Sequence, residues 1–132
     1  MFPLLNSDVV ESLFKSYSVE KVKQTLFSMR SFKAPGLDGF MLGSIASFGM
    51  LLVIVYCGLA LGALNHQVFP SEINETLLVL ILKVEDPQCV TQLHMISLYS
   101  VAYKVISNAI VIRLRSLLPR LIAPTQYSFV LG

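Results

Sequence analysis

The feature that most constrains the fold of this chain is a long segment without charge. From Met41 to Leu64 there is no Asp, Glu, Lys or Arg, a run of about 24 positions where about 20 suffice to span the hydrocarbon core of a bilayer. The whole chain is apolar as well, with 55% hydrophobic and 14% charged residues. This segment must therefore be covered, either by lipid or by the rest of the protein.

A rigid loop directly precedes the apolar segment. Its sequence, from Ser31 to Phe40, is SFKAPGLDGF. Pro35 fixes φ, the two glycines can adopt conformations closed to other residues, and Asp38 can hydrogen-bond to its own backbone. Lys33 is therefore expected to be held on an ordered turn.

Hydrophobic periodicity predicts an α+β fold in a single domain of 132 residues. Thr76–Val84 is continuous and aliphatic, which predicts a largely buried strand, and an extended segment over about Val90–Ile96 would complete a β-hairpin. Helices are expected at Ser7–Lys15, at Val19–Met29 with Ser18 as its cap, and at Tyr99–Leu118.

Several ordered blocks follow the loop: NETLLVLILKV at Asn74–Val84, MISL at Met95–Leu98, YKVIS at Tyr103–Ser107 with Arg113-Leu-Arg115, and QYSF at Gln126–Phe129. With the loop, they resemble the N-terminal part of a reverse transcriptase from a plant LINE-type (non-LTR) retrotransposon. The resemblance runs from about Val19 to Gly132 and is interrupted between Met41 and Leu64. It implies a partial reverse transcriptase domain over residues 1–132, comprising an incomplete fingers region of a right-hand polymerase and the beginning of the palm.

The parent family is an RNA-directed DNA polymerase, a nucleotidyltransferase that binds an RNA template, a DNA primer and a dNTP. Its two Mg²⁺ ions are held by aspartates that the resemblance places beyond Gly132. None of the eight acidic residues here lies in such a setting. We therefore expect no catalytic residue, metal ligand or cofactor in this chain, no activity from it alone, and weak or no nucleic-acid binding.

Two residues stand at positions of the family's nucleotide site. Lys83 ends the predicted strand, where the family lysine neutralises the triphosphate of the incoming dNTP; a lysine that only marks where the strand leaves the core is the alternative. His94 stands in place of the family's arginine. A neutral imidazole cannot form the bidentate contact of a guanidinium, so the resemblance implies a weaker grip on phosphate.

Other candidates would contact nucleic acid more loosely. A backbone contact needs charge but little precise geometry, and the alternative is a solvated surface cation. The backbone candidates are Lys33, Lys104, Arg113 and Arg115. The resemblance adds Gln126 and Phe129 at the template-nucleotide site.

Three interpretations of residues 41–64 remain open. The resemblance is lost and regained there at near-constant spacing, as two compensating frameshifts in a degenerate coding sequence would produce. The second interpretation is a small single-pass membrane protein with a helix at 41–64, and the third is an ordinary buried helix. The first and third imply a nuclear or cytoplasmic location and the second a membrane.

Overall fold

The computed structural model describes residues 6–30, 33–47 and 49–118, which form five α-helices, two short 3-10 helices and one antiparallel β-hairpin. The expected α+β class is confirmed. In chain order the elements are α1 (Ser7–Phe14), α2 (Val19–Ser28), α3 (Leu42–Ser47), α4 (Met50–His66), η1 (Ser71–Asn74), β1 (Thr76–Leu82), η2 (Val90–Gln92), β2 (Leu93–Tyr99) and α5 (Val101–Arg115).

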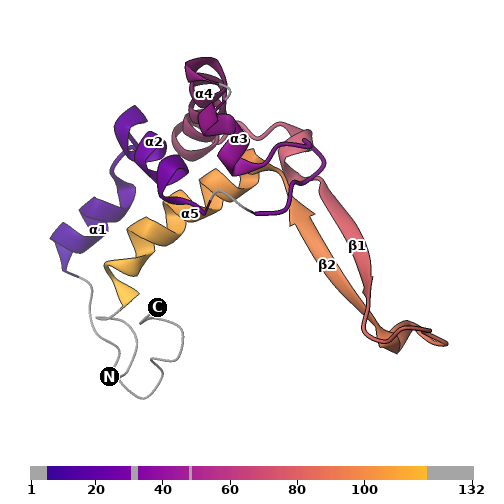
Figure 1. Cartoon of the computed structure of the whole chain (residues 1–132). Helices are drawn as coiled ribbons and strands as arrows, with labels where there is room; N and C mark the ends of the chain where they lie inside the picture. The colour runs from indigo at the N-terminus through magenta and orange to yellow at the C-terminus, as the bar shows by residue number, and fades with distance from the viewer. Residues whose placement is uncertain (1–5, 31–32, 48, 119–132) are drawn as a thin grey trace.

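Three helices, α2, α4 and α5, pack on one another and form the core (Figure 1). The Ser18 hydroxyl accepts a hydrogen bond from the Lys21 amide and caps α2 as predicted. Ser100 caps α5 in the same way through the Tyr103 amide. The core side chains come from all three helices, with α3 and η1 adding a few: Val22, Leu26, Leu42, Ile45, Val53, Tyr56, Cys57, Ala60, Ala63, Ile73, Val101, Ala102, Val105 and Ile106.

The apolar segment forms two helices, so the expectation of one helix through 41–64 is wrong. α3 ends at Ser47, α4 begins at Met50, and Gly49 between them has a φ of 92°, which right-handed helices do not allow. One side of α4 packs into the core, while Met50, Leu51 and Ile54 are exposed. Within the described residues, no helix combines the length and apolarity needed to cross a membrane.

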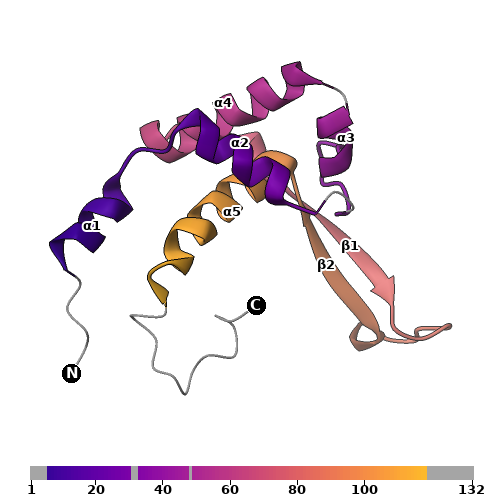
Figure 2. The same ribbon diagram turned by 60° about the vertical axis from the view of Figure 1, so that its left-hand side comes forward.

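The predicted hairpin is confirmed, but the expected burial of its first strand is wrong. β1 and β2 pair antiparallel from Thr76↔Tyr99 to Leu82↔Leu93. Figure 2 shows the hairpin extending away from the helices, so neither face of its outer half lies on the core. Four aliphatic side chains of β1 are consequently about half exposed: Leu78 58%, Leu80 56%, Ile81 47% and Leu82 56%.

Candidate functional site

Residues 33–40 of the loop before α3, which we call the Gly/Pro loop, are docked on the junction between β2 and α5. Asp38 accepts a hydrogen bond through Oδ2 from the Val101 amide at 2.6 Å, which satisfies one of the free amides at the start of α5. The Lys104 ammonium donates to the Ala34 carbonyl at 2.7 Å. Gly36 lies so close that an added Cβ would come within 2.4 Å of the Tyr99 carbonyl carbon and oxygen. Three contacts thus fix the loop against the first turn of α5.

A tyrosine of α4 extends this docking. The Tyr56 hydroxyl donates to Asp38 Oδ2 at 3.5 Å, and the second carboxylate oxygen, Oδ1, is buried without a partner among the described residues. Burial raises the pKa of Tyr56 to about 12, and the negative charge and hydrogen bond of Asp38 add to the effect. The apolar segment therefore contributes a polar contact to the loop that precedes it.

Docking of the loop creates a hollow of about 260 Å³, which we call the tyrosine hollow. Two lysines predicted to contact nucleic acid, Lys33 and Lys104, meet there although they are far apart in the sequence. The rings of Tyr99 and Tyr103 lie beside them, stacked with centroids 4.5 Å apart and planes inclined by 15°. The complete lining is Met29, Lys33, Tyr99, Tyr103, Lys104, Ser107, Asn108 and Val111.

The two lysines differ in their surroundings. Lys33 is exposed, whereas Lys104 is half-buried. Burial lowers the pKa of Lys104, the Asp38 carboxylate raises it, and the positive charge of Lys33 lowers it. Since the two ammonium groups repel each other, an anion placed between them would be stabilised by both charges.

The sequence interpretation missed both tyrosines of this hollow. Tyr99 is the last residue of β2, and Tyr103 lies in the first turn of α5. Their four-residue spacing brings them together only because the chain passes directly from strand to helix at Ser100. The signal available in the sequence was two tyrosines four positions apart, the second of them directly before Lys104.

The two nucleotide-site candidates lie near the tip of the hairpin. His94 pairs with Ile81 in the strand register, and Lys83 directly follows Leu82, the last residue of β1. The Lys83 amide donates to the Gln92 carbonyl at 2.9 Å and its ammonium donates to the Thr91 carbonyl at 3.1 Å. Both side chains are exposed near the hairpin tip, away from the tyrosine hollow.

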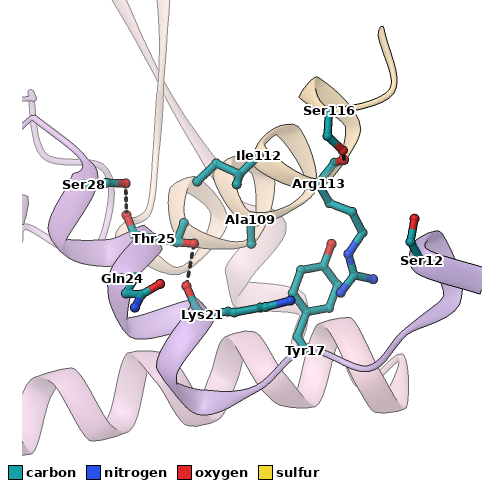
Figure 3. Close-up of a pocket in the computed structure, with 10 residues that line it drawn as sticks. All are labelled: Ser12, Tyr17, Lys21, Gln24, Thr25, Ser28, Ala109, Ile112, Arg113 and Ser116. Atoms are coloured by element: carbon teal, nitrogen blue, oxygen red, sulfur yellow. Dashed lines mark hydrogen bonds between the residues drawn. The ribbon is translucent and has the colours of Figure 1, made fainter. Parts of the chain in front are cut away.

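Arg113 lines a second hollow, of about 440 Å³, between α2, α5 and the turn after α1 (Figure 3). Its guanidinium lies 3.4 Å from the centre of the Tyr17 ring and donates to the Leu13 carbonyl at 2.9 Å. Tyr17 is tied in turn to α4, because its amide and carbonyl both bond to the side chain of Asn65. Arg113 thus holds elements of the fold together.

Arg115 lies in the last turn of α5, and Gln126 and Phe129 lie outside the described residues. The described part of the chain brings together no group of three His, Cys, Asp or Glu side chains that could hold a metal ion. Of the predicted nucleic-acid contacts, Lys33 and Lys104 are brought together in the tyrosine hollow.

No protein-family model matches the chain. A protein of Xenopus laevis described as "Transposon TX1 uncharacterized 149 kDa protein" is 28% identical to it over 130 residues. The match covers 98% of this chain and 10% of that protein, so the chain spans about a tenth of its relative. The similarity supports a transposon-related origin.

Proposed function

We propose that this chain is a degenerate fragment of the fingers region of a retrotransposon reverse transcriptase of the plant LINE (non-LTR) type, inactive alone. Its residual role is weak binding to the backbone of the RNA template and DNA primer. The order of the sequence blocks supports this proposal, as does the similarity to a transposon protein over nearly the whole chain. Mg²⁺ in the parent reaction stabilises charge on the transferring phosphoryl group, and we assign no ligand for it within the described residues.

The observation that carries the proposal is the meeting of Lys33 and Lys104 in the tyrosine hollow. Contacts to a phosphate backbone depend chiefly on positive charge, and the docked loop holds two such charges beside one another. Among the described residues the Lys104 ammonium donates to the Ala34 carbonyl, and an ammonium carries three donors, so it can also donate to a phosphate oxygen.

The same proposal assigns Lys83 and His94 to the triphosphate of the incoming dNTP. Their position near the hairpin tip is compatible with one ligand that contacts both. His94 would contribute less than the arginine of the parent family because it is mostly neutral at pH 7 and lacks the guanidinium's paired donors.

Neutralising the lysines of the hollow tests the proposal. Binding of a fluorescein-labelled RNA–DNA template–primer by the purified chain would be followed by anisotropy at low salt. Lys33→Gln with Lys104→Gln should weaken binding about tenfold, because each lost phosphate contact removes counterion release. The matched control is Lys15→Gln with Lys23→Gln, which removes the same charge. Lys15 follows α1, and α1 lies near the far end of α5, where Arg113 contacts Leu13.

Equal weakening by both double variants would mean that net charge alone drives binding. That result would contradict the assignment of the contact to the tyrosine hollow. A wild-type chain that fails to bind the template–primer at low salt would overturn the proposed function itself.

A further inference from the structure

The tyrosine hollow combines two features that a backbone contact alone does not require. Beside its two ammonium groups lies a stacked aromatic pair, with Tyr99 36% exposed at the edge of the hairpin. A volume of about 260 Å³ falls just below the range of about 300–1,000 Å³ usual for small-molecule pockets. The space is therefore suited to a small planar group.

We propose that one unpaired nucleobase of a single-stranded nucleic acid stacks on the Tyr99–Tyr103 pair while its flanking phosphate lies between Lys33 and Lys104. This inference rests on the proposed function and deepens it, because it names the strand state that the fingers recognise. Aromatic side chains beside cations are the usual means of holding single strands without sequence preference.

The remaining lining residues fit this occupant. Met29 and Val111 supply apolar surface at the edge of the hollow, and Ser107 and Asn108, one turn further along α5, supply hydrogen-bonding groups that can face the edge of a base. A base in a duplex is already stacked and paired, so it cannot enter without being unpaired. The hollow should consequently prefer single strands.

The effect of the rings can be measured separately from that of the charges. Anisotropy would compare a labelled single-stranded oligonucleotide of about eight nucleotides with an abasic chain of the same length. We expect the wild type to bind the base-containing strand about tenfold more tightly, because stacking on an aromatic ring contributes to affinity only where a base is present. The same strand annealed into a duplex should lose this advantage.

Two substitutions at one position provide the variant and its control. Tyr99→Thr removes the ring but keeps a residue with high strand propensity, opposite Thr76 in the hairpin register. It should abolish the preference for bases, and its circular dichroism spectrum reports whether the protein is folded. Tyr99→Phe keeps the ring and should behave as the wild type.

The outcomes separate the two proposals. If the wild type binds both strands equally and Lys33→Gln with Lys104→Gln weakens both, the charge contact stands and the stacking inference fails. A preference for the duplex, or a preference for bases that survives Tyr99→Thr, also overturns it. If neither strand is bound, both proposals fail.

Discussion

At the scale of single residues, Gly36 is the position where the backbone leaves no room for a side chain. A Cβ would collide with the Tyr99 carbonyl group and lie 2.7 Å from the Ser100 nitrogen, all main-chain atoms that cannot turn aside. Gly36→Ala should therefore lower the free energy of unfolding by about 1–3 kcal/mol, as overpacking does.

Gly58→Ala is the matched control for this prediction. Gly58 lies inside α4 with no atom near an added Cβ, so alanine should stabilise the helix by about 0.5–1 kcal/mol. Urea denaturation followed by circular dichroism measures both variants. Loss of stability in both, or in neither, would mean that the loop is not docked on Tyr99 as described.

Tyr56 makes the free energy of unfolding depend on pH in the alkaline range. Its pKa is about 12 in the folded chain against an ordinary value of 10.0, so between these values the unfolded form loses its proton first. The stabilising effect is fully present below pH 10 and is lost as pH rises toward 12.

Tyr56→Phe should reduce the loss of unfolding free energy between about pH 9 and about pH 11. A smaller slope remains, because burial also raises the pKa of Tyr17. Denaturant titrations at the two pH values measure the difference. An unchanged slope in the variant would contradict the raised pKa of Tyr56 in the folded chain.

At the scale of elements, the hairpin carries more apolar surface than it buries. Leu80 and Met95 are direct cross-strand partners, and they are 56% and 63% exposed. Large exposed apolar patches favour association. Replacing both residues by threonine should reduce self-association in light scattering without lowering the melting temperature, because threonine pairs well across strands.

The opposite face of the hairpin supplies the control. Val79 and Ile96 are also direct partners, but both are half-buried. The same change there should lower the melting temperature and affect self-association less. If self-association persists when Leu80 and Met95 are replaced, the surface that mediates it belongs to another element, such as the exposed side of α4.

The sequence predicted where helices and strands lie better than it predicted which of their residues are buried. Helix caps and strand residues act through neighbours in the chain, which is why the Ser18 cap of α2 and the β1–β2 hairpin were found. Burial of β1 was not predictable from its aliphatic run alone, because burial depends on which other elements reach it. The break at Gly49 was missed because an uncharged run reveals little about where a helix ends.

At the scale of the whole molecule, contacts between distant segments create the candidate site. The Gly/Pro loop, the end of β2 and the start of α5 meet because Asp38 bonds to Val101, 63 positions along the chain. Individual lysines could be nominated from sequence, but their convergence beside Tyr99 and Tyr103 required the three-dimensional structure. The site is thus a product of docking between elements.

Photo-crosslinking tests most directly where nucleic acid lies on this molecule. The wild-type chain would be irradiated with a single-stranded RNA that contains 4-thiouridine, and the attached peptides identified by mass spectrometry. Adducts should be concentrated on Tyr99 and Tyr103 and on the residues beside them in α5. Adducts confined to the hairpin tip near Lys83 or to the Arg113 hollow, at saturating RNA, would contradict it.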